Sequence, residues 1–166
     1  MSVTVIRAAE RDHWRSEWLE SWQSFPATGR LDGTDLRVVQ MWVAPDETDL
    51  EPGYDEADVT AALAAGDLVV VASGRPEHAG AAPVSIHSSA AALHVARMVP
   101  GRPVLLPDAP FGHLYVARGE VTIDHGGRTV TLSTGDAVRT TDAGAIPLAG
   151  PGGAEILFWE MHAGVR

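Results

Sequence analysis

The stretch AALHVARMVPGRPVLLPDAPFGHLYVARGEVTIDHGGRTVTL, residues 91–132, decides the fold of this chain. Short runs rich in Val, Leu and Ile alternate here with breaks of Gly, Pro or Asp, which is typical of β-strands joined by turns. The adjacent glycines Gly126 and Gly127 tolerate the positive φ angles of a tight hairpin turn. Residues 124–128 are therefore predicted to be a turn between two paired strands.

The same pattern continues outward in both directions, and 17 Gly and 11 Pro supply the turns. Such closely spaced short strands favour an all-β jelly roll over alternating strands and helices. The predicted strands cover residues 36–43, 68–72, 84–87, 92–98, 104–106, 113–117, 121–124, 129–132, 137–140, 145–148 and 155–161.

Length and composition limit the function classes. The 166 residues fit one domain, and 12 basic against 22 acidic residues give a net charge of −10, which disfavours nucleic acid as a direct partner. All basic residues are Arg, and Lys, Cys and Asn are absent. Schiff-base lysines, thiolate nucleophiles, disulfides and Cys-ligated metals are thereby excluded. No apolar run is long enough for a membrane span and no signal peptide is recognisable, so we expect a cytoplasmic protein without membrane contact.

A cluster of acidic residues lies between the predicted strands 36–43 and 68–72. Its spacing does not match a calcium-binding loop, and the nearby Pro and Gly indicate a solvated connector. The cluster consists of Asp46, Glu47, Asp49, Glu51, Asp55, Glu56 and Asp58. Near the N-terminus, Trp14, Trp18 and Trp22 recur every four residues, which predicts a helix with one buried aromatic face.

Strand alternation sorts the histidines onto faces of the sheet. His94 shares a face with Met98, His113 shares one with Tyr115, and Phe158 shares one with Glu160. Three interpretations of His94 and His113 stay open: buried core histidines, general acid–base groups partnered by Glu160 or Tyr115, and metal ligands, although no H-x-H or H-E-x-x-H motif occurs. Four further histidines lie in or beside turns and termini and are expected to be solvated, namely His78, His87, His125 and His162.

Several segments resemble the C-terminal half of pirin-like bicupins. They are VVQMWVAPDETDLEPGY (38–54), DLVVVASGRPEHAG (67–80), residues 91–123, GDAVRTT (135–141) and AEILFWEMH (154–162), while IRAAERDHWRSEWLESWQSFP (6–26) resembles the beginning of the same family. The resemblance implies a cupin, an RmlC-like jelly-roll β-barrel over residues 36–166, with residues 1–35 as a short N-terminal segment packed on it. It also implies extended structure near Trp14–Trp22, so that helix and strand both remain open there.

The resemblance further implies that the family's metal-binding N-terminal cupin, whose iron is held by three His and one Glu, has no counterpart between residues 30 and 36. The equivalent ligand positions of the remaining cupin fall within 106–110, at Gly112 and at Ile146, where only Asp108 could bind a metal ion. A homodimer that restores a bicupin-like shape, with exchanged N-terminal segments, is expected, because the exposed apolar face would need a partner.

These observations lead to three functional hypotheses. The first is a cupin without metal or other cofactor that binds a small apolar or aromatic molecule and, if it is an enzyme, performs acid–base chemistry as an isomerase, cyclase or lyase. The second is a protein-interaction or regulatory module of the pirin type, and the third is a metal-dependent, quercetinase-like dioxygenase. The predicted catalytic residues are His94 and His113, and the predicted ligand-binding residues are Met98, Tyr115, Phe158 and Glu160.

Overall fold

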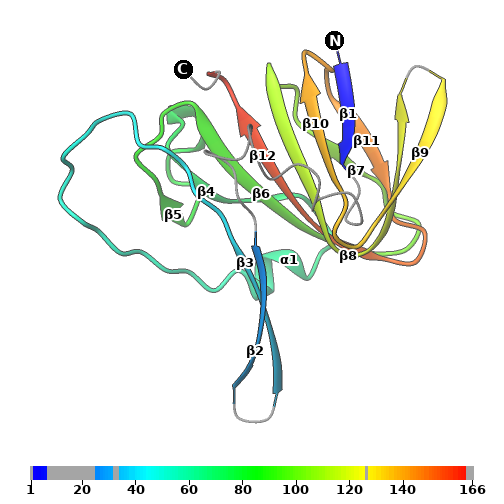
Figure 1. Cartoon of the computed structure of the whole chain (residues 1–166), viewed down its shortest axis with the longest axis horizontal. Helices are drawn as coiled ribbons and strands as arrows, with labels where there is room; N and C mark the ends of the chain where they lie inside the picture. Colours follow the sequence, from blue (N-terminus) through cyan, green and yellow to red (C-terminus); the bar gives the residue numbers. More distant parts are fainter. Residues whose placement is uncertain (1, 7–24, 32–33, 126, 164–166) are drawn as a thin grey trace.

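The computed structural model describes the backbone of residues 2–6, 25–31, 34–125 and 127–163, and the side chains of 39–124 and 127–163. Strands dominate it, as the sequence predicts (Figure 1). The strands are β1 (Ser2–Ile6), β2 (Phe25–Leu31), β3 (Thr34–Gln40), β4 (Val69–Ser73), β5 (Val84–Ser85), β6 (Ala91–Met98), β7 (Val104–Leu106), β8 (Phe111–His125), β9 (Arg128–Ser133), β10 (Ala137–Thr141), β11 (Ile146–Ala149) and β12 (Ala154–Met161). Two short helical turns, α1 (Thr60–Leu63) and η2 (Pro76–His78), complete the described elements. The expected all-β jelly-roll class is confirmed.

Ten strands form one strongly curled sheet (Figure 1). Its main path runs β1-β10-β8-β12-β6-β4-β5, while β9 and β11 pair with β8, and β7 pairs with β11. All of these pairs are antiparallel except β4 with β5. The curl brings one face of every long strand toward a common interior, because side chains of a strand alternate between its two faces.

The predicted hairpin at the adjacent glycines is confirmed, since β8 pairs with β9 and His125 lies opposite Arg128. The two strands predicted at 113–117 and 121–124 instead form the single strand β8. Gly119 permits this continuity, because its φ of +83° is open to glycine and an added Cβ would collide with the carbonyl oxygen of Gly153. The chain therefore bends at Gly119 without leaving the sheet.

The inner face of the curled sheet holds the main apolar core. Phe158 of β12 lies opposite Leu114 of β8 and opposite His94 of β6, so these three side chains share the inner face. The core consists of Ala96, Met98, Val104, Leu106, Leu114, Val116, Val121, Ile123, Leu132, Val138, Ala143, Ile146, Leu148, Ala154, Ile156 and Phe158. A smaller cluster on the outer face contains Tyr115, Ala117 and Ala137, packed against Val39 and Leu157.

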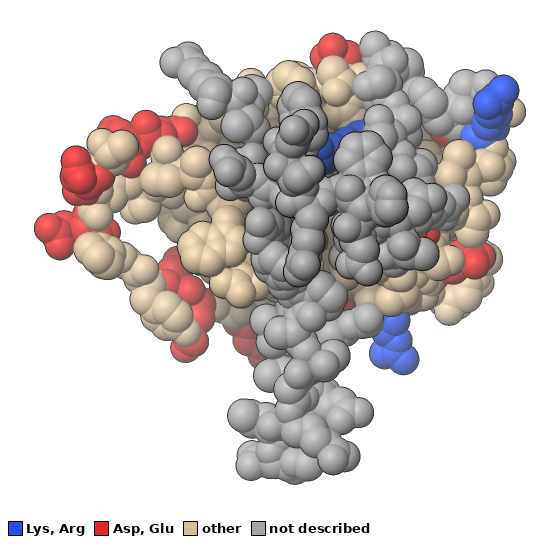
Figure 2. All heavy atoms as spheres, viewed as in Figure 1, with Lys and Arg blue, Asp and Glu red and all other residues tan. Residues whose placement is uncertain are grey.

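The hairpin of β2 and β3 projects from the sheet, and the connector that follows it extends sideways (Figure 1). Figure 2 shows acidic side chains gathered along this connector, and all seven acidic residues of the predicted cluster are exposed. The solvated connector is thus confirmed. The segment with Trp14, Trp18 and Trp22 lies outside the described residues, and the expected homodimer with exchanged N-terminal segments stays a prediction.

None of the helices in the described ranges is long and apolar enough to cross a membrane.

Candidate functional site

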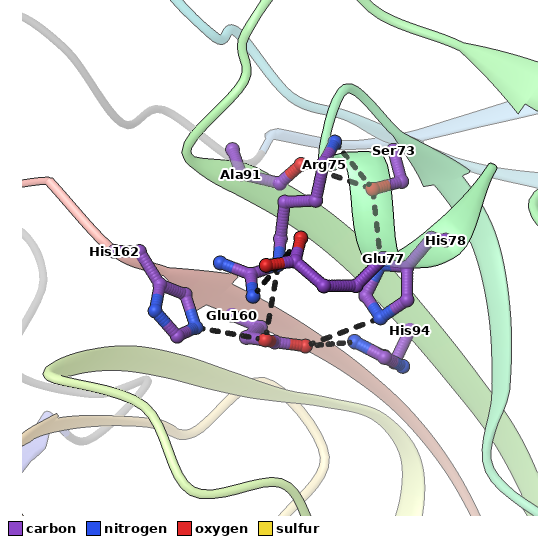
Figure 3. Close-up of polar contacts among 8 residues, drawn as sticks. All are labelled: Ser73, Arg75, Glu77, His78, Ala91, His94, Glu160 and His162. Atoms are coloured by element: carbon purple, nitrogen blue, oxygen red, sulfur yellow. Dashed lines mark hydrogen bonds and ion pairs between the residues drawn. The ribbon is translucent and has the colours of Figure 1, made fainter.

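A buried carboxylate, Glu160 of β12, is the centre of the most concentrated polar cluster in the described part of the chain (Figure 3). Oε2 of Glu160 lies 2.7 Å from Nε2 of His94 and 3.9 Å from Nε2 of His78. Oε1 lies 2.9 Å from Nε2 of His162 and 3.3 Å from Nε of Arg75. The two oxygens thus have different neighbours: two imidazoles on one side, and an imidazole with a guanidinium on the other.

Strand geometry explains how His94 and His162 reach Glu160. β6 pairs with β12 so that His94 lies opposite Phe158. Glu160 is two residues after Phe158 and points to the same inner face of the sheet. His162 follows β12 directly, two residues after Glu160, and its backbone N–H donates to the carbonyl oxygen of Ala90 at 2.8 Å. That hydrogen bond keeps the chain extended past the end of the strand, so that residues 160 and 162 point the same way.

His78 and Arg75 reach Glu160 from the turn after β4. Gly74 lets this turn pass close to its neighbours, because an added Cβ would lie 2.5 Å from the carbonyl oxygen of Ile86 and closer still to that of Ser88. The hydroxyl of Ser73 then accepts a hydrogen bond from the backbone N–H of Arg75 at 3.0 Å and lies 3.0 Å from Nδ1 of His78. The turn after β4 therefore places the side chains of Arg75 and His78 beside the end of β12.

The surroundings of Glu160 keep its carboxylate ionised. Burial alone would raise the pKa of Glu160, but hydrogen bonds from His94 and His162 and the charge of Arg75 lower this pKa to about 2. The carboxylate is consequently a permanent negative charge at any physiological pH.

The cluster runs from the interior to the surface. The side chains of Glu160 and His94 are 6% and 9% exposed, that of His78 is 20% exposed and that of His162 is 32% exposed. The ring of His78 meets the ring of His94 edge-on, with 5.5 Å between their centroids. His78 and His162 therefore lie nearer the surface than His94 and Glu160.

Four of the six predicted site residues lie on the inner face, and the structure brings two of them together. His94 and Glu160 form the hydrogen bond described above. Phe158 lies beside His94, with 6.4 Å between the ring centroids, and is fully buried in the core. Met98 is also buried there, four residues along β6 from His94, against Gly150. Within the described residues, Met98 is not part of the polar cluster around Glu160.

The expectation that His113 and Tyr115 line the barrel interior is wrong. Both are on the outer face, because β8 pairs His113 with Trp159 and Tyr115 with Leu157, whose side chains point away from Phe158. Within one strand, the sequence shows which side chains share a face. It does not show which of the two faces of a strand lies toward the interior. His94 and His113 therefore cannot act on one ligand inside the barrel.

The buried His113 is nevertheless expected to make the stability of the folded chain depend on pH. Burial, followed by the nearby charge of Arg139, lowers the pKa of His113 from 6.5 to about 4. Between these values the unfolded chain binds more protons than the folded chain, so the free energy of unfolding should fall as the pH drops from 6.5 toward 4, by at most about 1.4 kcal/mol per pH unit. Urea unfolding across this range should show a flatter dependence for His113→Gln. The exposed His87 gives the control His87→Gln, which should keep the wild-type slope; equal slopes for both variants would contradict the prediction.

The positions that the family resemblance assigns to cupin metal ligands carry none here. Leu106 and Ile146 lie opposite each other on β7 and β11 and are buried in the core. At Gly112 an added Cβ would lie 2.8 Å from the ring of Phe158 and would also collide with Oγ1 of Thr140. Asp108 is exposed. Leu106, Gly112 and Ile146 are therefore surrounded by packed side chains, whereas Glu160, which pairs with Gly112, places a carboxylate on the same face from the next strand.

Sequence reasoning missed Arg75, His78 and His162. The expectation of a solvated His78 is wrong, because its ring packs against His94 beside Glu160. His162 could have been found from alternation, since residues 160 and 162 of one extended segment share a face. The turn that carries Arg75 and His78 has no periodicity, so no local signal in the sequence could have placed it there.

Comparison with known proteins agrees with this fold. The chain is 46% identical over 128 residues, 77% of its length, to a protein of Mycobacterium tuberculosis whose name is "Putative quercetin 2,3-dioxygenase Rv0181c". It is 30% identical over 129 residues, 76% of its length, to a protein of Zymomonas mobilis with the same name and the designation ZMO1337. The chain spans about half the length of these curated relatives, 50% and 52%. No family model matches the chain.

Solved structures show the same architecture. YhhW from Escherichia coli superposes with a TM-score of 0.63 at 22% identity, over 80% of this chain and 53% of YhhW. A structure of the bacterial pirin YhhW in complex with nickel(II) gives a TM-score of 0.59 at 19% identity, over 78% of this chain and 52% of that chain. The chain therefore has the cupin fold, and it is related in sequence to the mycobacterial proteins and similar in fold to the bacterial pirin YhhW.

Proposed function

We propose that this chain is a metal-dependent cupin whose metal site consists of His78, His94 and Glu160. The observation that carries the proposal is the convergence of Nε2 of His78, Nε2 of His94 and a carboxylate oxygen of Glu160, all within 4.8 Å of one another. These atoms come from η2, β6 and β12, so the fold itself assembles the set. Two imidazoles and one carboxylate are the donor set of non-haem iron oxygenases.

The hydrogen bonds of His78 support a ligand role. The single hydroxyl proton of Ser73 is directed to the carbonyl oxygen of Ala91, 3.4 Å away. When the hydroxyl oxygen in turn accepts a hydrogen bond from the Nδ1–H group of His78, Nε2 of His78 carries a free lone pair. This lone pair points toward the negative Oε2 of Glu160 across 3.9 Å. Two electron-pair donors facing each other at this distance fit a cation between them, and a fixed tautomer is typical of metal-ligating histidines.

The other oxygen of Glu160 supports the carboxylate from behind. His162 and Arg75 contact Oε1, which leaves Oε2 directed at His78 and His94. Outer hydrogen bonds of this kind orient ligating carboxylates. His94 contributes Nε2 at 2.7 Å from Oε2 and would exchange this hydrogen bond for a bond to the ion through a deprotonated Nε2.

The class of reaction follows from the donor set and from the relatives. A metal ion held by two His and one Glu with open positions supplies oxygen chemistry or Lewis-acid polarisation of a bound oxygen atom. The relatives named as quercetin 2,3-dioxygenases support the oxygenase class. We therefore place the metal-dependent dioxygenase ahead of the metal-free cupin, with a small aromatic molecule as substrate.

A second candidate function is favoured by one specific contact. His94 and Glu160 form a direct hydrogen bond of 2.7 Å, and Arg75 lies 3.3 Å from the other oxygen of the carboxylate. A histidine oriented by a buried carboxylate is a usual general acid–base pair. The site could thus serve the cofactor-independent isomerase, cyclase or lyase chemistry that the sequence suggested.

Metal uptake separates the two candidates. The purified chain should bind about one Fe²⁺ or Ni²⁺ ion, and His78→Ala and His94→Ala should each weaken binding by more than about 100-fold, since even outer partners of a metal ligand are worth about 10 to 100-fold. Isothermal titration and elemental analysis measure both. The exposed His87 supplies the control His87→Ala, which should bind like the wild type. A wild-type chain that binds no divalent ion at millimolar concentration would reject the metal site and leave the acid–base pair.

A further inference from the structure

Arg75 is the one guanidinium of the described cluster, and its Nε has no hydrogen-bond partner among the described residues. Its side chain is 10% exposed, and Nε, although 3.3 Å from Oε1 of Glu160, makes no hydrogen bond within the described part of the chain. Nη2 lies 3.5 Å from Oε2 of Glu77. Both separations exceed the 2.7–2.9 Å or so of charge-assisted hydrogen bonds. A guanidinium presents five N–H donors in a fork that matches a carboxylate, so Arg75 has donors available for another anion.

Glu77 is a weakly held partner of Arg75. Its side chain is 64% exposed and belongs to the same turn, two residues further along the chain (Figure 3). Surface ion pairs are worth roughly 0–1 kcal/mol because water screens them. The carboxylate of Glu77 can therefore leave Arg75 at little cost when another carboxylate arrives.

The charges of the side chains at the site determine whether it attracts an anionic or a cationic ligand. Glu160 and Arg75 cancel (−1 + 1 = 0), and a bound divalent ion would bring their sum to +2, or to +1 with Glu77 included. Without the ion, the three side chains sum to −1. In a chain of net charge −10, the loaded site would thus be a local positive region at the partly exposed end of the barrel. Anion binding there should depend on the metal.

We propose that Arg75 binds the carboxylate of a small organic acid beside the His78–His94–Glu160 site, with Glu77 as the internal carboxylate that the ligand displaces. The inference rests on the proposed metal site and specifies its ligand class. Arg75 contacts Glu160 on Oε1, while the metal ligands face Oε2, so an acid held by Arg75 would lie against the metal position without competing with His78 or His94.

The test titrates the full chain, saturated with Ni²⁺, with benzoate and with its neutral analogue benzamide. Wild-type protein should bind benzoate at least about 10-fold more tightly than benzamide, since one to two charge-assisted hydrogen bonds are at stake. Arg75→Lys, which keeps the charge but loses the fork, should weaken benzoate binding by about 10-fold, and Arg75→Gln by more. Glu77→Gln should strengthen benzoate binding several-fold because the competing carboxylate is gone. Arg97→Gln, in an exposed pair with Glu155, is the matched control and should leave affinity unchanged.

The outcomes separate the inference from the metal site. If all variants take up Ni²⁺ but benzoate affinity is the same in wild type, Arg75→Lys and Glu77→Gln, the ligand inference fails and the metal site stands. Absence of benzoate binding to the Ni²⁺-loaded wild type at millimolar concentration would overturn the inference as well. If the wild type takes up no metal, the metal site fails; benzoate binding to the metal-free chain then decides, and affinity that does not depend on Arg75 overturns the inference. Glu77→Gln changes only an exposed side chain, so it keeps the test valid should an Arg75 variant fail to fold.

Discussion

Glu160→Gln should abolish metal binding and destabilise the chain. Gln keeps the shape of the side chain but removes the negative charge that three imidazoles and Arg75 surround. Loss of a direct ligand should cost more than the roughly 10 to 100-fold of an outer partner. Removal of one member of a buried ion pair leaves the other charge uncompensated, at about 3–5 kcal/mol. Titration with Ni²⁺ measures the first effect, and urea unfolding of the metal-free protein measures the second.

The same strand provides the control for this experiment. Glu155 of β12 pairs with Arg97 at 3.3 Å, but the two side chains are 37% and 51% exposed. Glu155→Gln removes an equal charge from the same strand and should change the free energy of unfolding by less than about 1 kcal/mol, with unchanged metal binding. If the two variants behaved alike, Glu160 would be neither a metal ligand nor a compensated buried charge.

Phe158→Ala should produce the largest loss of stability that a single core substitution causes here, about 3–5 kcal/mol in the free energy of unfolding. Phe158 is 1% exposed and fills the inner face between β6 and β8, next to the ring of His94 and above Gly112. Its removal leaves a cavity that the surrounding strands cannot close, because they are hydrogen-bonded to one another. Chemical unfolding of the metal-free chain gives the value directly.

Leu105 on β7 is the comparison for Phe158, since it is a large apolar side chain of a strand but is 61% exposed. Leu105→Ala should change stability by no more than about 0.5 kcal/mol. The comparison also examines the earlier hypothesis that Phe158 binds a ligand. A loss for Phe158→Ala no larger than that of Leu105→Ala would mean that the ring lines an open cavity rather than completing the core.

Most of the fold could be predicted from the sequence because the signals are local. Several strands begin and end within one residue of the predicted positions, namely β6, β7, β9, β10 and β12. The prediction works here because Gly, Pro and Asp mark the ends of these strands. The sequence predicts two strands where the structure has the single strand β8, because a glycine at a bend within a strand looks the same in a sequence as a glycine in a turn. Pairing distinguishes them: residues on both sides of Gly119 stay hydrogen-bonded in the sheet, to β12 before it and to β9 after it.

The site was predictable only where it depends on alternation. Alternation along the predicted strands indicates His94 and Glu160 as site residues, and the two are hydrogen-bonded. Alternation alone also groups His113 with them, because which of the two faces of a strand lies inward depends on its packing against other strands. The structure places His113 on the outer face. Arg75 and His78 needed the path of a turn, which Gly74 and the approach of residues 86 and 88 determine. Functional residues that lie in turns cannot be predicted from the periodicity of the sequence.

The turn that follows β4 gives the molecule a separable element of specificity. Within four consecutive residues, Arg75–Pro76–Glu77–His78, it carries one proposed metal ligand, the proposed anion anchor and the carboxylate that competes for it. The barrel contributes only His94 and Glu160 to the proposed centre, and both are fixed by sheet register. Substitutions in these four positions could therefore retune which ion and which acid are accepted while the hydrogen-bonded framework stays intact, so that relatives with one scaffold could diverge in chemistry by exchanging a single short loop.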